Sequence, residues 1–365
     1  MAAGASEAMK SYSLAVIPGD GIGREVVPEG LRVLDAVSKR FGFALHYAHF
    51  DWSCETYKST GKMMPDGGLE QLRQHDAIFL GAVGFPGVPD HISLWGLLIP
   101  IRRAFDQYVN LRPVRLLPGV PCQLQGRRPG DIDFWVVREN TEGEYSQLGG
   151  RFHAGSEDEL VIQESIFTRK GTDRIMRYAF EFAQKLNRLH VTSATKSNGL
   201  YHSMPFWDER FAAMSQNYPH IRADQYHVDI LAARFVMSPE RFDVVVGSNL
   251  FGDILSDLGP GVTGTIAVAP SANINPERRY PSMFEPVHGS APDIAGRGIA
   301  NPIGQIWSAA MMLEHFGELA ASAALMKAIE GVLSDPGSPR TPDLGGRATT
   351  AQLGQAIADA VASER

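Results

Sequence analysis

The sequence has few cysteines, no long apolar run and no excess of positive charge. Its two cysteines, Cys54 and Cys122, cannot form a disulfide framework, so we expect a reducing compartment and a cytoplasmic location. No apolar run approaches the ~20 residues that a membrane-spanning helix needs, so we expect no membrane insertion. The net charge of −7 gives no general attraction to nucleic acid or to anionic lipid. Any local group of arginines therefore needs a specific anionic ligand to explain it.

The length of 365 residues is typical of two domains. Short apolar runs such as 14–17, 77–82, 244–246 and 266–268 indicate strands. An amphipathic stretch at 170–186 indicates a helix, and further helices are expected at 65–75, 303–315 and 319–334. Strands that alternate with helices predict an α/β fold. Residues 1–11 are rich in Ala, Gly and Ser without the apolar segment of a secretory signal, and we expect a loose extension there.

A glycine-rich loop, Pro18-Gly19-Asp20-Gly21-Ile22-Gly23, follows the first predicted strand. Its glycine spacing differs from the dinucleotide fingerprint, and no suitable acidic residue ends a second strand. The sequence therefore argues against a Rossmann fold.

Two carboxylates, Asp253 and Asp257, lie four residues apart just after the predicted strand 244–246. We expect a turn over 249–252 and a helix from Asp253, which puts both carboxylates on one helix face. Such a pair suits a hard divalent ion, Mg²⁺ or Mn²⁺, because these ions take oxygen ligands. The alternative is a solvated face with an acidic residue favoured near a helix N-terminus.

Several motifs, in order, carry a family resemblance. They are Ile-Pro-Gly-Asp-Gly-Ile-Gly at 17–23, Asn-Leu-Arg-Pro at 110–113, Val-Arg-Glu-Asn-Thr-Glu-Gly at 137–143, Lys196 with Asn198, Asn-Leu-Phe-Gly-Asp-Ile-Leu-Ser-Asp at 249–257 and Glu-Pro-Val-His-Gly-Ser-Ala-Pro-Asp-Ile-Ala-Gly at 285–296. The chain resembles the NAD(P)-dependent β-decarboxylating 2-hydroxyacid dehydrogenases, which include isopropylmalate, isocitrate, homoisocitrate and tartrate/D-malate dehydrogenases. A set of motifs this long and in this order is far more specific than any one of them.

The resemblance implies a two-domain, isopropylmalate-dehydrogenase-like α/β fold with a mixed sheet shared between the domains. It implies a cofactor-binding domain from 12–108 plus 264–362 and a substrate and dimerisation domain at 109–263. It also implies a homodimer that exchanges an arm near 146–168 between subunits.

The resemblance assigns roles to charged and polar residues. Asp253 and Asp257 would bind Mg²⁺ or Mn²⁺ together with Asp229 of the neighbouring subunit, and K⁺ would be a further activator. Lys196 would help to deprotonate the substrate hydroxyl, and Tyr145 would reprotonate the enolate after CO₂ leaves. The three arginines that would grip the substrate carboxylates are Arg102, Arg112 and Arg138.

The 285–296 loop matches the family's cofactor site. His288 would lie against the adenine, Gly289 would let the backbone approach the cofactor, and Asn301 would contact the adenine. Asp293 would accept hydrogen bonds from the ribose and repel a 2′-phosphate, which predicts NAD rather than NADP.

The predicted reaction is NAD- and metal-dependent oxidative decarboxylation of a small 2-hydroxy diacid. Thr195 and Ser197 beside Lys196, and Trp95 ahead of Arg102, are similar to the tartrate/D-malate dehydrogenases. We therefore expect D-malate to give pyruvate and CO₂, with tartrate as a further substrate. Leu98 keeps 3-isopropylmalate as an alternative substrate.

Two hypotheses come from other classes. A non-catalytic regulatory subunit would have lost a metal carboxylate, the lysine or the tyrosine, and all are present here. A metal-dependent lyase or phosphotransferase would reuse the carboxylates, and the predicted cofactor loop argues against it.

Overall fold

The computed structural model describes residues 9–363, which form two compact units. Unit 1 contains the chain up to Ile101, Thr265–Ala272 and the chain from Glu277, and unit 2 contains Arg102–Gly264 and Asn273–Pro276. The division predicted from the sequence assigns residues 102–108 to the first domain, whereas the structure groups them with unit 2. Most of the extension predicted for residues 1–11 lies outside the described residues, and Ser11 already begins the first strand.

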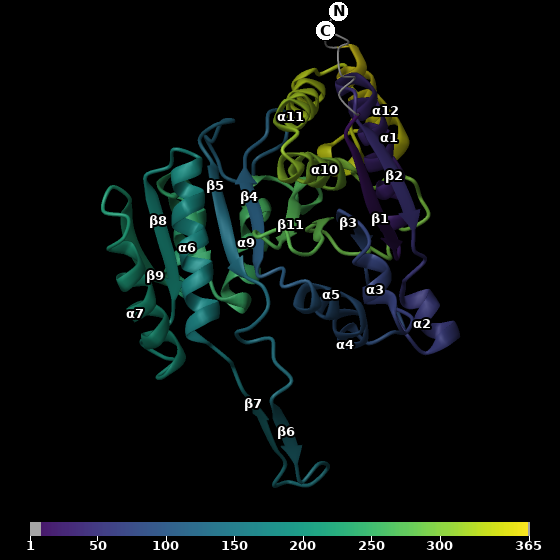
Figure 1. Cartoon of the computed structure of the whole chain (residues 1–365). Coiled ribbons are helices and arrows are strands. Elements are labelled where there is room, and N and C mark those ends of the chain that lie inside the picture. The colour runs from purple at the N-terminus through teal and green to yellow at the C-terminus, as the bar shows by residue number, and fades with distance from the viewer. Residues whose placement is uncertain (1–8, 364–365) are drawn as a thin grey trace, which may run out of the picture. The chain divides into compact units, whose positions relative to one another are not determined.

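Unit 1 is built on parallel strands in the order β2-β1-β3-β12. Figure 1 labels β2, β1 and β3 side by side. Leu14 to Ile17 of β1 are fully buried because helices cover the strand. The elements are β1 Ser11–Gly19, α1 Gly23–Phe41, β2 Ala44–His49, α2 Cys54–Thr60, α3 Gly68–Leu72, β3 Ala77–Ala82, α4 Asp90–Ser93, a π-helical turn Leu94–Leu98, a 3₁₀ turn Ile266–Val268, β12 Ser282–Pro286, α10 Ile303–Phe316, α11 Leu319–Ser334, a 3₁₀ turn Pro342–Leu344 and α12 Thr350–Ser363. Two further elements cross the unit boundaries, namely α5 Ile99–Ala104 and β11 Pro270–Ile274.

In the glycine-rich loop after β1, the backbone packs directly against the backbone of neighbouring segments. Gly19 has φ 72°, and a Cβ there would lie 2.0 Å from the carbonyl oxygen of Ala82, so only glycine fits. Gly21 approaches the carbonyl of Ser290 just as closely, and the N–H of Ile22 donates to that carbonyl at 2.9 Å. Gly19 therefore packs the loop after β1 against the end of β3, and Gly21 packs it against the loop after β12.

Unit 2 has strands in the order β4-β5-β10-β8-β9, with β4 antiparallel to β5 and the other pairs parallel. Val244, Val245 and Val246 of the central strand β10 are fully buried, as their apolar run predicts. The elements are β4 Val109–Arg115, β5 Asp133–Glu139, β6 Gly149–Phe152, β7 Leu160–Gln163, α6 Arg169–Lys185, β8 His190–Thr195, α7 Ser203–Ser215, β9 Arg222–His227, α8 Val228–Met237, a 3₁₀ turn Pro239–Arg241, β10 Val244–Gly247 and α9 Asn249–Thr263.

The α/β class and the mixed sheet are confirmed, and three local predictions are wrong. The expected turn at 249–252 is the first turn of α9, the expected strand at 266–268 is a 3₁₀ turn, and the helix expected over 65–75 shrinks to α3. Helix α8 also begins directly after β9, where the sequence analysis predicted no helix. Among residues 9–363, no helix combines the length and apolar character needed to cross a bilayer.

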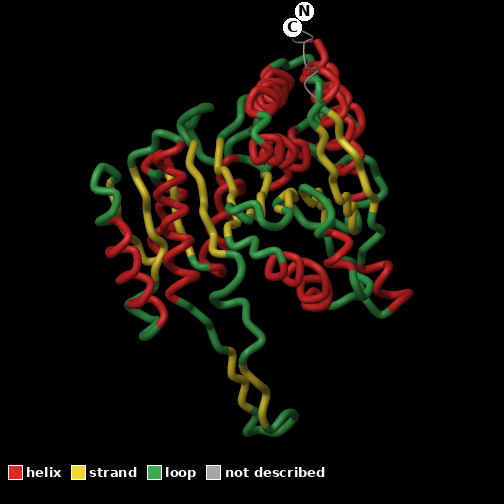
Figure 2. The backbone as a smooth tube through the Cα atoms, in the orientation of Figure 1, coloured by secondary structure: helices red, strands yellow, loops and turns green. Residues whose placement is uncertain are grey.

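An antiparallel hairpin, β6–β7, forms within residues 146–168 (Figure 2). Figure 2 shows its two short strands at the end of two long loop segments. Leu148, Phe152, Leu160 and Val161 are all exposed on or beside it. An isolated two-stranded ribbon is only marginally stable in water, and grouped exposed apolar side chains are typical of contact surfaces.

Candidate active site

The acidic pair lies on α9, which begins at Asn249. The Glu144 carboxylate accepts a hydrogen bond from the Ser248 hydroxyl at 2.7 Å and from the Leu250 N–H at 3.0 Å. A carboxylate that satisfies a free N–H at a helix N-terminus also complements the helix dipole. This side-chain cap explains why the helix starts earlier than predicted.

Arg138, at the end of β5, is buried against the start of α9. Its Nε and Nη2 donate to Asn249 Oδ1 at 3.1 and 2.7 Å, and its Nη1 pairs with Asp253 Oδ1. The Asn249 amide donates in turn to the Glu142 carbonyl at 2.9 Å. Burial is the main cause that lowers the pKa of Arg138 to about 10, so the guanidinium stays charged at neutral pH.

Arg112, on β4, is buried beside the same helix. Its Nη1 donates to Asp257 Oδ1 at 2.7 Å and to Ser256 Oγ at 2.8 Å, and its Nη2 lies 3.6 Å from Asp253 Oδ1. Arg102 is also buried, and its charge acts on Arg138, Asp253 and Tyr145. The three predicted arginines therefore gather around the acidic pair in unit 2.

Tyr145 completes this cluster. Its hydroxyl donates to Asp253 Oδ2 at 2.6 Å, and the Arg138 guanidinium carbon lies 5.5 Å from the ring centroid. Burial, followed by the hydrogen bond to Asp253, raises the pKa of Tyr145 to about 12. The phenol thus keeps its proton at neutral pH, as a proton donor requires.

The pKa values of the Asp253 and Asp257 carboxyl groups shift in opposite directions. Burial disfavours ionisation of Asp253, but the charges of Arg138 and Arg112 outweigh it and hold its pKa below the usual value. Burial raises the pKa of Asp257 above the usual value, and the neighbouring charge of Asp253 adds to the rise. Positive charge beside the pair therefore offsets the repulsion between the two carboxylates.

The residues fit a divalent metal ion in part. Asp253 and Asp257 offer hard carboxylate oxygens from one helix face, and their side chains are 31% and 52% exposed. Within residues 9–363 of a single chain, however, no group of three or more His, Cys, Asp or Glu side chains is placed to hold a metal. A complete ligand set therefore needs a residue from outside this cluster.

Lys196 and Asp229 form a separate pair. Lys196 follows β8 and Asp229 lies in the first turn of α8, with Nζ and Oδ2 2.9 Å apart. The hydrogen bond from Lys196 is the main cause that lowers the pKa of Asp229. The lysine and aspartate side chains are 30% and 67% exposed, so both can reach a second molecule.

The predicted cofactor residues follow β12 in unit 1. His288 is buried, its Nδ1 lies 2.9 Å from the Gly289 carbonyl, and burial lowers its pKa, so the ring is neutral. Its buried Nε2 has no hydrogen-bond partner among the described residues, which fits a nitrogen that meets a ligand. Gly289 and Asp293 are exposed, and a Cβ on Gly289 would meet nothing within 4 Å.

Asn301 is buried and fixed by two contacts. Its amide donates to Asp343 Oδ2 at 3.0 Å, and its Oδ1 accepts from the Ile303 N–H at 3.0 Å at the start of α10. Asp343 also accepts from the Thr341 hydroxyl at 2.6 Å. Asp343 was not predicted from the sequence, because Asn301, which it holds in place, lies 42 residues away in the chain.

Three polar residues that hold the acidic cluster in place were not predicted, namely Glu139, Glu144 and Asn249. Each lies inside or beside a motif that carries the family resemblance. That motif was the sequence feature from which these three residues could have been predicted. Their roles depend on partners that only the structure identifies, such as Arg138 for Asn249.

Comparisons with known proteins identify the family of the chain. The family model described as isocitrate/isopropylmalate dehydrogenase matches residues 13–357. The chain is 65% identical over 356 residues to a D-malate dehydrogenase (decarboxylating) of Escherichia coli (strain K12), covering 96% of this chain and 98% of the relative. It is 62% identical over 360 residues to a tartrate dehydrogenase/decarboxylase of Pseudomonas putida, with the same two coverages.

A solved structure of isocitrate dehydrogenase from Methylococcus capsulatus superposes with a TM-score of 0.88 at 35% identity, covering 96% of this chain and all of that one. Agreement over nearly the whole chain confirms the predicted fold. The chain belongs to the isocitrate/isopropylmalate dehydrogenase family.

Proposed function

We propose that this chain catalyses the NAD- and divalent-metal-dependent oxidation and decarboxylation of a small 2-hydroxy diacid. D-malate would give pyruvate and CO₂, and tartrate would be a further substrate. The observation that carries the proposal is near full-length identity of 65% and 62% to relatives named for D-malate and tartrate. The names of these relatives favour D-malate and tartrate over 3-isopropylmalate as substrates.

The arginine cluster supplies the substrate site. Arg102, Arg112 and Arg138 would bind the two carboxylates of the diacid, since a planar guanidinium matches a carboxylate with two parallel hydrogen bonds. Asp253 and Asp257 would hold Mg²⁺ or Mn²⁺. When bound, that ion would supply positive charge beside the hydroxyl oxygen, and NAD would supply the hydride acceptor for C2.

Two residues of the chain would move protons. Lys196 would accept the proton of the C2 hydroxyl, directly or through water. Tyr145 would give its phenolic proton to C3 after CO₂ has left, and its raised pKa keeps that proton available. The hydrogen bond from Tyr145 to Asp253 sets the phenol beside the carboxylate that would bind the metal.

The proposed active unit is a homodimer. In one chain, Lys196 and Asp229 bond to each other and do not join the acidic pair in a metal-binding group. Ile230, Val236 and Met237 of α8 and Ile254 of α9 are exposed apolar side chains on the helices that carry these aspartates. A two-fold partner would cover them and would bring its Asp229 to Asp253 and Asp257.

The proposed cofactor is NAD. The unpartnered Nε2 of His288 supports a ligand at the loop after β12, and the exposed Asp293 carboxylate would accept from a ribose hydroxyl and repel a 2′-phosphate.

The free state of Cys54 and Cys122 is in keeping with the cytoplasmic location expected from the sequence.

The segment that precedes Arg102 would determine which substrate the enzyme accepts. A π-helical turn spans Leu94–Leu98 and carries Trp95, and such turns are frequent at functional sites. A bulky indole there would favour substrates with only hydrogen or hydroxyl on C3 over those with an isopropyl group.

The test compares kcat/KM for D-malate, tartrate and 3-isopropylmalate on the purified protein, each with NAD and with NADP, by NADH or NADPH absorbance. We expect D-malate with NAD to give the highest value. Activity confined to 3-isopropylmalate would reject the substrate assignment, and a preference for NADP would reject the role given to Asp293.

A further inference from the structure

A hollow of about 300 Å³ lies in unit 1 at the edge where its parallel strands begin. Asp76 and Pro281 immediately precede β3 and β12, and Tyr12 is the second residue of β1. The side chains that matter for binding are Arg73, His75, Arg278, Arg279, Tyr280 and His315. A hollow of this size suits a small metabolite.

The lining has an excess of positive charge in a protein whose net charge is −7. Three guanidinium groups line it against one carboxylate, Asp76, which accepts a hydrogen bond from the Ser13 N–H at 2.7 Å. Burial lowers the pKa of His75, so its ring is neutral, and Arg73 Nε lies 3.3 Å from the exposed Glu70 carboxylate. Arg73 also lies over the Tyr280 ring, with its guanidinium carbon 4.9 Å from the centroid. Arginines held by aromatic rings are pre-organised to bind anionic oxygens.

The backbone at Arg278 is unusual. It has φ 54°, in the left-handed region that non-glycine residues rarely adopt. This conformation belongs to the loop between β11 and β12, where Arg278 and the next residue, Arg279, both line the hollow. Positions of this kind occur in turns and cluster at binding sites.

The hollow is separate from the proposed cofactor loop. Strand β12 starts next to Pro281 and ends at Pro286, just before His288, so a strand of roughly 17 Å lies between them. Helix α10 likewise starts near Asn301 and ends at Phe316 beside the hollow, about 21 Å along its axis. An anion in the hollow would therefore not be the phosphate of a cofactor bound by that loop.

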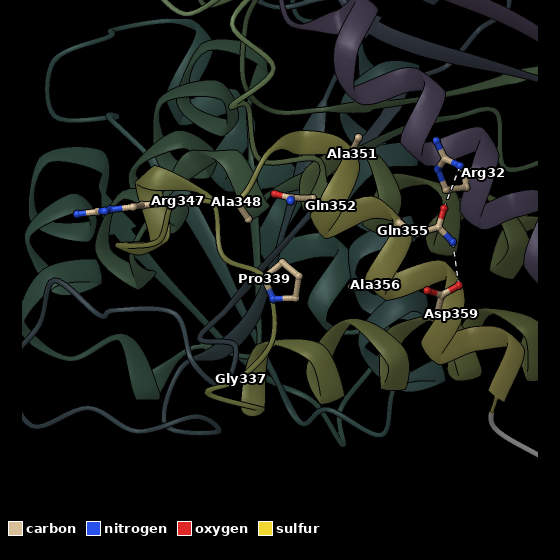
Figure 3. A pocket seen from close by; sticks show the side chains of 10 residues that line it. All are labelled: Arg32, Gly337, Pro339, Arg347, Ala348, Ala351, Gln352, Gln355, Ala356 and Asp359. Atoms are coloured by element: carbon tan, nitrogen blue, oxygen red, sulfur yellow. Dashed lines mark hydrogen bonds between the residues drawn. The ribbon is translucent and has the colours of Figure 1, made fainter.

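A second hollow in unit 1, beside α12, lacks these features (Figure 3). Arg32 there is bonded to Glu29 and Gln355, and Figure 3 shows Arg347 at the opposite end of the group, directed away from Arg32. Its two guanidinium groups do not converge, so they do not form one anion site.

We propose that the hollow lined by Arg73, Arg278 and Arg279 binds a small organic polyanion through clustered phosphate or carboxylate oxygens. The proposal is independent of the reaction proposed above, since it concerns binding alone. The guanidinium groups supply the charge, and Tyr280 and His315 form the aromatic wall.

The test is isothermal titration of the full-length protein with pyrophosphate and, separately, with citrate. The protein is first saturated with NAD, which fills the cofactor site. We expect one site per chain for at least one anion, weakened about tenfold or more in Arg73→Gln and in Arg278→Gln. The control Arg128→Gln removes an exposed arginine of unit 2 and should leave binding unchanged.

A stronger response to pyrophosphate or to citrate would identify phosphate or carboxylate as the recognised group. Arg112→Gln separates this site from the substrate site. Loss of binding in Arg112→Gln with retention in Arg278→Gln would overturn the proposal. So would the absence of saturable heat with both anions, or equal weakening in Arg128→Gln.

Discussion

Glu139 is a buried carboxylate whose hydrogen-bond donors all come from the residues just after it. It accepts from the N–H and hydroxyl of Thr141 and from the N–H of Glu142, at 2.8–3.0 Å. These bonds fold the loop that leads to Tyr145. Burial is the main cause that raises the pKa of Glu139 to about 7.

The raised pKa makes stability depend on pH. Between the unfolded pKa and about 7, the folded state binds more protons than the unfolded state, so Glu139 lowers the free energy of unfolding as pH rises. Glu139→Gln cannot titrate and keeps an oxygen acceptor. We expect the variant to gain stability relative to wild type from about pH 5 to about pH 8, measured by urea unfolding at equal protein concentration. A constant difference across that range would contradict the assignment.

Tyr145→Phe removes only the phenolic oxygen. If this group protonates C3, kcat for D-malate should fall by roughly 10²–10⁴, measured as pyruvate formation under saturating substrate. The matched control is Tyr47→Phe, which removes a phenol that donates to Asp35 at 2.7 Å in unit 1 and should leave kcat unchanged. An equal fall in both variants would indicate a general effect on folding.

The predicted site residues of unit 2 were named from ordered motifs. Arg112, Arg138 with Tyr145, and Asp253 with Asp257 come from three separate segments, and the structure brings them into one cluster. Their pairing was not foreseen, because hydrogen-bond partners depend on strand order and side-chain direction.

At the scale of elements, the Glu144 cap fixes the start of α9. We expect Glu144→Gln to lower the free energy of unfolding by about 1 kcal/mol and to raise the Mn²⁺ concentration needed for half-maximal activity, because α9 carries Asp253 and Asp257. The control is Ser53→Ala, which removes the side-chain acceptor for the Thr56 N–H at the start of α2. It should cost similar stability without changing the Mn²⁺ requirement.

The sequence predicted long elements better than their ends. The helices at α6, α10 and α11 follow from amphipathic or apolar runs, and all three were placed within two residues. The first turn of α9 was missed because its cap, Glu144, lies over a hundred residues away. The strand predicted at 266–268 is a 3₁₀ turn because a short apolar run has no periodicity to decide between the two.

At the scale of the whole molecule, the residues predicted to share one metal site form two separate groups in the described chain. Asp253 and Asp257 lie with the arginines and Tyr145, while Asp229 lies with Lys196. The family resemblance predicted that Asp229 serves the neighbouring subunit, which stays a prediction. Two-fold symmetry makes it testable, since each site of a dimer would then draw on both chains.

Co-expression of Asp229→Asn with Asp253→Asn tests this sharing. Each variant alone should be inactive, but a mixed dimer would contain one intact site and one doubly damaged site. Random pairing makes half of the dimers mixed, so we expect about a quarter of wild-type activity. The control pair, Asp253→Asn with Asp257→Asn, damages the same half in both chains and should recover nothing. If size-exclusion chromatography shows dimers and the first pair recovers no more than the control, Asp229 does not act across the interface.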